Sequence, residues 1–396
     1  MNNKINIVLL GANYFGLMAS SQRVRNLMDG LLLSYNVIIN NITFNASDIN
    51  GGSNKKVKLI NINYSLKNPF SFVLFYRQAY KALCEIKERD AINVLYFYGY
   101  PSIETIWIIK RAKRLGYCVV FDIVEKLHAF DLSKASWYNK FKCFTARKML
   151  KQIPKLGSVC FAISYTLVEY CSDICKEKIP VVHLPISVNE EYVCSFKKEK
   201  NKDDSIRVFY GGSFGFKDGI DLLIQGFTKA AKEYDNIELI LTGKISKQMQ
   251  DSLDTLIQQS QAAGKIHYLG CLTTEQYYET MVNMDILCMT RVNSDFANAG
   301  FPFKLGEYLA SANAIIATRT TDIEKYLTHE ENVYIIEPDS IDAIANAIIV
   351  LVADKKLRTK IGREAPNVAK QFFSLMRVSS ILYENLTTHC IKYKLT

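Results

Sequence analysis

Residues 206–227, IRVFYGGSFGFKDGIDLLIQGF, join an apolar run to a helical pattern through a glycine-rich turn. The run Ile206–Tyr210 predicts a buried strand, and the apolar residues that recur every three or four positions after Gly219 predict a helix as far as Tyr234. Glycines in such a turn let backbone amides approach an anion, which the amino end of the helix also attracts. The turn is neither a Walker loop nor a complete Gly-x-Gly-x-x-Gly motif, so a tight turn without a ligand is the alternative.

The same alternation of apolar runs and helical patterns continues in both directions. Strands are predicted after the turn at Ile237–Thr242, Ile266–Leu269, Ile286–Thr290, Ala314–Ala317 and Val333–Ile336. Strands are predicted before it at Ile5–Leu10, Val37–Ile42, Val94–Tyr98, Cys118–Ile123 and Ser158–Ile163. Strands that alternate with helices of this length predict a parallel sheet covered on both faces.

The length of 396 residues suggests two or three domains, at about 150 residues per domain. A charged run, FKKEKNKDD at residues 196–204, separates the two alternating stretches. We therefore predict an α/β protein with two doubly wound domains, residues 1–187 and 188–372. Ligands of such sheets bind beyond the carboxyl ends of the strands, so a cleft between the domains is expected to hold them. With 49% hydrophobic and 22% charged residues, the composition excludes a disordered or collagen-like chain.

A second cluster, FPFKLGEYLA at residues 301–310, opens a predicted helix. Pro302 suits the first turn of a helix, and Lys304 and Glu307 are three residues apart, so they share one face near its amino end. A cation and a carboxylate in that position can hold a diphosphate and a ribose diol. A surface ion pair is the alternative.

These two clusters resemble glycosyltransferase family 4. FPFKLGEYLASANAIIAT, residues 301–318, resembles the signature helix of that family, and FYGGSFGFKDGIDLLIQGF, residues 209–227, resembles its diphosphate-binding loop. VLLGANYFGLMASSQRVRNL, residues 8–27, resembles the acceptor-side glycine loop. The resemblance implies the GT-B fold, with two Rossmann-like domains facing a central cleft and a helix over 373–396 that crosses back to the first domain.

The resemblance also implies roles for individual residues. Catalytic roles are expected for Lys304, Lys217, His128 and Glu125. Donor-binding residues are expected at Gly211, Gly212, Ser213, Lys217, Gly243, Asn298, Gly300, Lys304, Leu305 and Glu307. Acceptor-side residues are expected at Gly11, Gly16 and Arg23. His128 and Glu125 follow a strand of the first domain, where a loop without a role is the alternative for His128.

Three departures from the family pattern stand out. The first signature Glu is replaced by Ala299, for which Asn298, Gly300 or backbone groups can substitute. The Arg expected after the glycine loop is Ser213, and Lys217 lies one residue before the usual position of the phosphate-binding Lys. These changes leave the sugar specificity open.

Positive charge is concentrated in the first half of the chain, which has a net charge of +10 overall. Residues 1–187 hold 25 Lys and Arg against 12 Asp and Glu, and residues 188–396 hold 24 against 27. Beside Trp137, Phe141 and Phe144 we predict a surface that docks on anionic lipid, with an ordinary solvated face as the alternative. Its expected cations are Lys110, Arg111, Lys113, Arg114, Lys140, Lys142, Arg147 and Lys148. No nucleic-acid-binding signature accompanies the charge, so nucleic acid is not expected as a partner.

The ten cysteines lie mostly in apolar runs, which favours buried free thiols in a reducing cytoplasm. Cys171 and Cys175, four residues apart, give only a weak zinc signal, and we expect neither a metal nor a cofactor. No apolar run is long enough to span a membrane, and the amino end leads directly into a strand without a signal-peptide pattern.

The sequence therefore predicts a retaining glycosyltransferase that moves a sugar from a nucleotide-diphospho-sugar to a lipid-linked glycan. Such a protein would be cytoplasmic and peripheral on the inner face of the cell membrane, in bacterial O-antigen, capsule or exopolysaccharide synthesis. A nucleotide-sugar 2-epimerase of the same fold and a non-catalytic glycan- or nucleotide-binding homologue are the alternatives.

Overall fold

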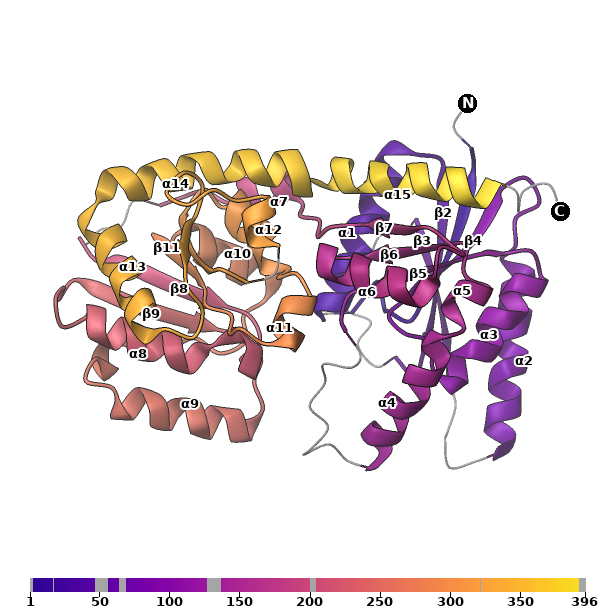
Figure 1. The fold of residues 1–396 in the computed structure, drawn as a ribbon, viewed down its shortest axis with the longest axis horizontal. Coiled ribbons are helices and arrows are strands. Elements are labelled where there is room, and N and C mark those ends of the chain that lie inside the picture. The colour runs from indigo at the N-terminus through magenta and orange to yellow at the C-terminus, as the bar shows by residue number, and fades with distance from the viewer. Residues whose placement is uncertain are drawn as a thin grey trace. The chain divides into compact units, whose positions relative to one another are not determined.

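The computed structural model describes residues 3–16, 18–46, 56–63, 69–126, 137–199, 204–320 and 322–391, with only the backbone for residues 69–72, 138, 139 and 142. The chain divides into two compact units (Figure 1). The first unit contains Met1–Ser187, Ala299–Phe301 and Leu375–Thr396, and the second contains Val188–Asn298 and Pro302–Ser374. His128 and the side chain of Lys142 lie outside the described residues.

The first unit is built on a parallel sheet of seven strands in the order β3-β2-β1-β4-β5-β6-β7. Its strands are β1 Ile5–Leu10, β2 Val37–Phe44, β3 Val57–Ile62, β4 Ile92–Tyr98, β5 Cys118–Ile123, β6 Val159–Ala162 and β7 Val181–His183. Its helices are α1 Ala19–Ser34, α2 Pro69–Glu85, α3 Ile103–Arg114, α4 Trp137–Leu150, α5 Ile153–Leu156, α6 Tyr165–Cys175 and α15 Leu375–Cys390. Helices flank the sheet on both sides (Figure 1).

The second unit is built on a parallel sheet of six strands in the order β10-β9-β8-β11-β12-β13. Its strands are β8 Ile206–Gly211, β9 Ile237–Thr242, β10 Ile266–Tyr268, β11 Ile286–Met289, β12 Ala314–Thr318 and β13 Tyr334–Ile336. Its α-helices are α7 Glu190–Cys194, α8 Ile220–Ala230, α9 Lys247–Gln259, α10 Thr274–Val282, α11 Asp295–Ala299, α12 Lys304–Ala310, α13 Ile341–Ala353 and α14 Lys355–Val368. Short turns of other helix types lie at η2 Phe216–Asp218, η3 Ala263–Lys265, η4 Ile323–Lys325 and η5 Ala369–Phe373.

Both sheets confirm the predicted α/β class with doubly wound parallel sheets. The order of strands reverses beside β1 in the first unit and beside β8 in the second. Strands that neighbour this reversal end at an open crevice, where α/β sheets bind their ligands. In the second unit this reversal lies between β8 and β11, so the glycine turn after β8 lies at the expected place.

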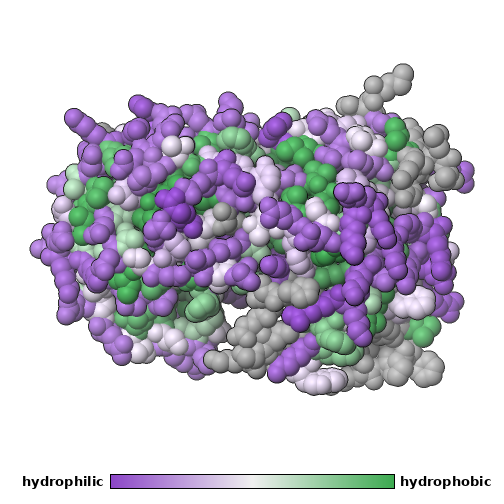
Figure 2. Space-filling view, in the orientation of Figure 1, coloured by the Kyte–Doolittle hydropathy of each residue, from purple (hydrophilic) through white to green (hydrophobic). Residues whose placement is uncertain are grey.

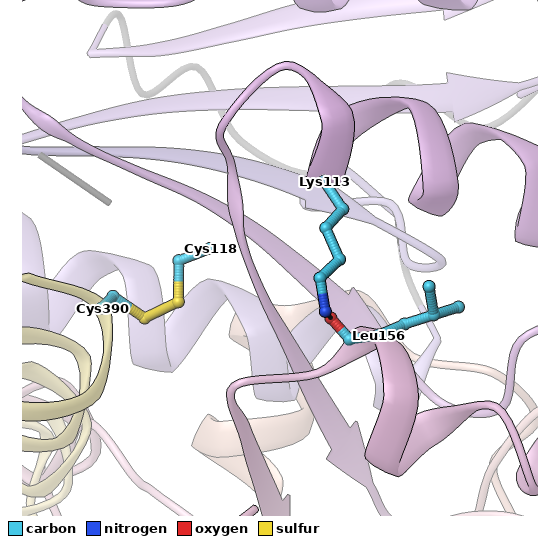
Figure 3. Close-up of a disulfide and its surroundings, with 4 residues drawn as sticks. All are labelled: Lys113, Cys118, Leu156 and Cys390. Atoms are coloured by element: carbon cyan, nitrogen blue, oxygen red, sulfur yellow. Dashed lines mark hydrogen bonds between the residues drawn. A yellow bond between two sulfur atoms is a disulfide. The ribbon is translucent and has the colours of Figure 1, made fainter. Parts of the chain in front are cut away.

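Helix α15 belongs to the first unit, where it packs along α1 (Figure 1). Gly30 in α1 makes the close approach possible, because a Cβ there would lie 2.8 Å from the Leu375 carbonyl oxygen. Tyr383 of α15 stacks on Tyr35 with ring centroids 3.8 Å apart. The end of α15 is joined to the start of β5 by a disulfide between Cys118 and Cys390 (Figure 3).

The disulfide contradicts the expectation of free thiols for Cys118 and Cys390, and the other eight cysteines are free. The two residues are 272 positions apart, so only the packing of α15 against the first sheet brings them together. Figure 3 also shows Lys113 donating to the Leu156 carbonyl oxygen, over 3.1 Å, at the end of α5.

Candidate functional site

The glycine turn of the second unit is held in place by close backbone packing. Gly212 has φ of +150°, and a Cβ there would lie 2.7 Å from Nζ of Lys304. Gly243, at the end of β9, has φ of +156°, and a Cβ there would lie 1.8 Å from the Gly212 carbonyl oxygen. Glycine is therefore required at both positions, and the loop after β9 supports the turn after β8.

Asp218 organises the inside of the turn. Its side chain is buried and accepts a hydrogen bond from the Ser213 hydroxyl over 2.8 Å. The second carboxylate oxygen, Oδ1, lies 3.6 Å from Nζ of Lys304, which projects from the first turn of α12. The Asp218 backbone carbonyl accepts from the Thr290 hydroxyl at the end of β11, over 3.2 Å. The aspartate therefore links β8, β11 and α12 where the crevice opens.

Lys304 is a buried cation without a hydrogen-bond partner for Nζ among the described residues. Its ammonium group lies 3.8 Å from the centroid of the Tyr210 ring, at the distance of a cation–π contact. Burial lowers the pKa of Lys304 to about 8, against the opposing effect of Asp218, and the charges of Arg291 and Lys217 lower it further. An anion placed beside this ammonium would restore its ordinary affinity for the proton.

Arg291 and Lys217 complete a group of three cations, which we call the cation cluster with Lys304. Arg291 follows β11 and is 5% exposed, and burial lowers the pKa of its guanidinium against the raising effects of Asp218 and Tyr210. Nζ of Lys217 lies 5.1 Å from the centroid of the Phe296 ring. Sequence reasoning missed Arg291, because no motif or spacing in its neighbourhood indicates a site.

Glu307 lies one helical turn after Lys304 on α12 and is 7% exposed. One carboxylate oxygen accepts from the Tyr278 hydroxyl over 2.6 Å, and the other accepts from the Tyr277 hydroxyl over 3.2 Å. Burial raises the pKa of Tyr277 well above its usual value, and the neighbouring Glu307 charge raises it further. The two tyrosine hydroxyls therefore hold both oxygens of the Glu307 carboxylate from the side of α10.

The two tyrosines come from α10, whose sequence shows only an ordinary amphipathic helix, and sequence reasoning did not find them. Leu305 is fully buried in α12, and its predicted role in donor binding can therefore involve only its backbone. Tyr308 of the same helix accepts a hydrogen bond from the Gly211 amide over 3.0 Å, which ties α12 to the glycine turn.

The loop between β11 and α12 contains the short helix α11. Ala299, at the position of the missing signature Glu, is fully buried. Asn298 donates to Oδ1 of Asn293 over 2.6 Å. Oδ1 of Asn298 itself is buried without a hydrogen-bond partner among the described residues. Asn298 therefore offers a free acceptor next to the substituted position, whereas Gly300 offers only its backbone.

The predicted acceptor-side residues lie in the first unit. Gly11 follows β1 with φ of +90°, and the carbonyl oxygen of Gly16 accepts a hydrogen bond from Arg25 over 2.6 Å. Arg23 is buried, and its guanidinium donates to both oxygens of Asp122 over 2.8 Å and to two backbone carbonyls after β7. This side chain has no exposed surface with which to contact an acceptor, so the structure favours a structural role for it.

Glu125 is exposed just beyond β5, and its backbone carbonyl accepts a hydrogen bond from the Tyr100 hydroxyl. Of the predicted docking cations with described side chains, five are exposed: Lys110, Arg111, Arg114, Lys140 and Lys148. Lys113 and Arg147 are half-buried. The ammonium of Lys113 donates hydrogen bonds to the carbonyl oxygens of Lys155 and Leu156.

Two absences hold for the part of the chain that the structure describes. No group of three or more His, Cys, Asp and Glu side chains there is arranged to hold a metal ion. Within the same residues, no helix combines the length and hydropathy needed to cross a bilayer.

Comparison with known proteins finds a family similar to the second unit. Residues 194–368 match the family model for glycosyl transferases group 1. The match covers most of the second unit, which therefore resembles the domains of that family. No curated protein is similar enough in sequence to count as a relative.

Solved structures of similar fold cover almost the whole chain. Sucrose-phosphate synthase from Thermosynechococcus elongatus has a TM-score of 0.74 at 15% identity, over 97% of this chain and 99% of its own. HepE from Anabaena, in complex with UDP-glucose, has a TM-score of 0.71 at 12% identity, over 97% and 100%. WaaG, a glycosyltransferase of lipopolysaccharide biosynthesis, has a TM-score of 0.67 at 12% identity, over 97% and 99%.

At these identities the likeness establishes the fold, which is the predicted GT-B fold. The group 1 domain and this fold together support a glycosyltransferase enzyme.

Proposed function

We propose that this glycosyltransferase transfers a sugar, with retention of configuration, from a nucleotide-diphospho-sugar to a lipid-linked glycan. The acceptor would be an intermediate of bacterial surface-polysaccharide synthesis, such as O-antigen, capsule or exopolysaccharide. The observation that carries the proposal is the buried Lys304, which lies against the glycine turn with no hydrogen-bond partner for its ammonium among the described residues.

The cation cluster suits the chemistry of a departing diphosphate. When the bond between the sugar and the diphosphate breaks, negative charge grows on the phosphate oxygens. Lys304, Lys217 and the amides of the turn are placed to stabilise that growing charge, and fixed charges in a buried site act strongly. These groups supply the charge stabilisation themselves, so the proposal needs no metal ion and no cofactor.

Retention follows in the proposal from attack on the same face of the sugar that the diphosphate leaves. The departing phosphate oxygen takes the proton of the acceptor hydroxyl, and no side chain forms a covalent bond to the sugar. Lys304 and Lys217 hold the charge on that oxygen. In the first domain, Glu125 and His128 are the proposed contacts to the acceptor hydroxyl and the donor sugar.

Glu307 is the proposed ribose ligand. The two tyrosine hydroxyls fix the carboxylate in one orientation, and a carboxylate, which only accepts hydrogen bonds, suits a pair of ribose hydroxyls. HepE binds UDP and UDP-glucose according to the names of its solved complexes, which supports a nucleotide-sugar donor.

Two helices of the first domain support the proposed membrane association. On α3, residues that share one face by helical spacing are exposed: Ile103, Trp107, Lys110, Arg111 and Arg114. On α4, which contacts α3, a matching exposed face consists of Trp137, Lys140, Phe141, Phe144 and Lys148. Figure 2 shows apolar and hydrophilic surface side by side over α4.

Aromatic and basic side chains on one helix face are typical of helices that lie in a membrane interface. We propose that these two faces, the basic–aromatic surface, dock the enzyme on the anionic inner face of the cell membrane, where a lipid-linked acceptor would be found. Each cation near such a surface contributes about 1 kcal/mol.

The docking proposal predicts loss of membrane binding when charge is removed. A variant with Lys110, Arg114, Lys140 and Lys148 changed to Gln should bind anionic vesicles on the order of a thousandfold more weakly. The control variant removes four exposed lysines of the second domain, Lys232, Lys247, Lys355 and Lys356, and should bind as the native protein does. Vesicle sedimentation at low and high salt measures the effect, because salt screens exposed charges. Equal binding by the two variants would refute the docking surface.

The donor proposal is tested by a thermal-shift screen of nucleoside diphosphates against the matching nucleosides. A ligand at about 100 times its dissociation constant stabilises the protein by about 2.7 kcal/mol, which shifts the melting temperature measurably. We expect stabilisation by one diphosphate and much less by its nucleoside. Free epimerised sugar nucleotide formed without acceptor would favour an epimerase, and binding without turnover in the presence of acceptor would favour a non-catalytic protein.

A further inference from the structure

A cavity of about 360 Å³ lies in the first domain at the amino ends of β6 and β7, at the opposite end of the sheet from the crevice where such sheets bind their ligands. Its walls come from four parts of the chain: the last turn of α3, the segment from α5 into β6, the residues before β7 and the last turn of α15. This volume is within the range of small-molecule sites, about 300–1,000 Å³. The proposed function gives the cavity no role.

Positive charge dominates the lining of this cavity. Lys113, Lys155 and Lys178 line it, and His389 lies beside them in the last turn of α15. Among the described residues that line the cavity there is no Asp or Glu. Like charges that are brought together repel one another, and a concave wall concentrates their field, so the lining favours an anionic ligand.

The three lysines keep donors for such a ligand. Nζ of Lys113 donates to the carbonyl oxygens of Lys155 and Leu156 over 2.7 and 3.1 Å, and an ammonium group has three donors, so one remains. Lys155 and Lys178 are exposed, and neither ammonium group forms an ion pair or a hydrogen bond with another described residue. An anion in the cavity can therefore be bound without breaking a contact of these side chains.

The walls of the cavity are fixed by contacts within the first domain. Lys113 ties the end of α3 to the end of α5. Cys390, the residue after His389, is joined to Cys118 at the start of β5 (Figure 3). The lining is therefore already in place before a ligand binds, which lowers the entropic cost of binding.

We propose that this cavity binds a phosphate monoester, with Lys113, Lys155 and Lys178 as its cations. A phosphate monoester carries about −1.5 to −2 charges at pH 7 and has three strong acceptor oxygens, which three ammonium groups match better than they match a carboxylate with a single charge. Ammonium groups on long side chains bind phosphate as point charges, so no fixed fork geometry is needed. The phosphate belongs either to a soluble metabolite or to the head of a lipid.

Lysines at helix ends also have an ordinary structural role. Lys113 and Lys155 lie in the last turns of α3 and α5, where positive charge is favourable beside free carbonyl oxygens. Lys178 lies between α6 and β7, outside both helices, so this role does not account for it. A structural role predicts that loss of the charges lowers stability and leaves phosphate binding unchanged, whereas a binding role predicts the reverse.

The test compares three double variants by titration calorimetry with glycerol phosphate and inorganic phosphate. K155Q/K178Q removes two of the cations, and K155R/K178R keeps their charge. The control K58Q/K87Q removes two exposed lysines of the same domain that do not line the cavity, and Lys58 lies on β3 at the opposite edge of the sheet from β7. We expect K155Q/K178Q to bind glycerol phosphate about 10- to 100-fold more weakly, with the other two variants close to the native protein. The second domain is identical in all three, so an anion bound there contributes equally.

Vesicles distinguish the two sources of the phosphate. Phosphatidic acid has a phosphate monoester as its head, whereas phosphatidylglycerol has a diester, and vesicles of equal charge should attract the basic–aromatic surface equally. If the ligand is a lipid, the native protein prefers phosphatidic acid, and K155Q/K178Q loses that preference. If the ligand is soluble, K155Q/K178Q loses affinity for glycerol phosphate and binds both kinds of vesicle as the native protein does.

Three results would overturn the phosphate site. Native affinity of K155Q/K178Q for glycerol phosphate and for phosphatidic acid would leave the lysines as cations of helix ends and loops. Equal weakening in K58Q/K87Q would show a general attraction of anions to the charge of the domain. A native protein that binds none of these probes has no such site. None of these results affects the proposed donor site, which lies in the second domain and is tested with nucleoside diphosphates.

Discussion

Each domain buries a cation against an aspartate near the carboxyl ends of its strands, yet the two sites differ in charge. In the first domain, Arg23 meets Asp122 through two hydrogen bonds of 2.8 Å and gives its remaining donors to backbone carbonyls. In the second, Asp218 faces the cation cluster and lies 3.6 Å from Nζ of Lys304. The guanidinium of Arg23 is saturated with hydrogen bonds, whereas the ammonium of Lys304 has no hydrogen-bond partner among the described residues.

The difference between the two sites appears in the pKa values of Arg23 and Lys304. Burial alone would lower the pKa of both groups. At Arg23 the attraction of Asp122 and the hydrogen bonds outweigh burial, and the pKa of the guanidinium is raised. At Lys304 burial and the two neighbouring cations outweigh Asp218, and the pKa falls to about 8. A buried ion pair with every donor bonded serves the fold, whereas a buried ammonium without a hydrogen-bond partner suits a ligand of opposite charge.

Removing Arg23 should have the largest effect on stability. R23M leaves Asp122 buried without its partner, which should lower the free energy of unfolding of the first domain by about 3–5 kcal/mol. Denaturant unfolding monitored by circular dichroism measures this loss, and nucleotide binding to the second domain serves as the control readout. A loss below about 1 kcal/mol would show that the pair is not structural and would return Arg23 to the acceptor-side candidates.

Removing Lys304 should act on turnover and not on the fold. In K304Q the charge that stabilises the departing diphosphate is lost, and turnover should fall by one to three orders of magnitude, or about 1.4–4 kcal/mol, while donor affinity falls less. K217Q should change turnover in the same direction. K229Q, at an exposed lysine of the same domain that pairs with Asp342, is the control.

Steady-state kinetics and direct donor binding, measured on the same preparations, show whether Lys304 acts on turnover or on donor affinity. If K304Q lowers kcat/KM through KM alone and leaves kcat unchanged, Lys304 only anchors the donor. The melting temperature of K304Q should not fall, which is the contrast with R23M.

Local patterns predicted most of the fold. Alternating apolar runs and helices predicted most strands of the two parallel sheets, but the edge strands β3 and β7 were missed. The polar Lys58 and Asn61 interrupt the apolar residues of VKLINI in β3, and β7 has only three residues. As an edge strand, β3 pairs with β2 alone and is only partly buried, so its sequence needs no continuous apolar run. The Cys118–Cys390 disulfide was missed because it depends on how α15 packs, which no local pattern encodes.

The residues of the candidate site also divide into those that a local motif indicates and those that only the tertiary structure brings together. Gly212, Lys304 and Glu307 lie in two short motifs, so their neighbourhood in the sequence indicates them. Arg291 and Tyr278 reach the site only through tertiary structure, from the end of β11 and from α10. A buried arginine after a strand and a tyrosine on an amphipathic helix are ordinary in sequence, and only their neighbours in space show a function.

Glu307 allows the smallest but most specific test of the second site. E307A removes the acceptor for two tyrosine hydroxyls and for the proposed ribose diol, and a hydrogen bond to a charged group contributes about 1.5–3 kcal/mol. Donor affinity should fall accordingly, with the circular dichroism spectrum unchanged.

The decisive comparison for Glu307 uses UDP or GDP and the analogue that lacks one ribose hydroxyl. The native protein should bind the deoxy analogue more weakly, whereas E307A should bind both equally, because the group that distinguishes them is gone. Y278F keeps the carboxylate and loses one of the two bonds that orient it, so it should weaken this discrimination without abolishing it. If E307A still prefers the ribose form by the native factor, the carboxylate belongs to the tyrosine network alone, and the second domain would hold its nucleotide by the diphosphate.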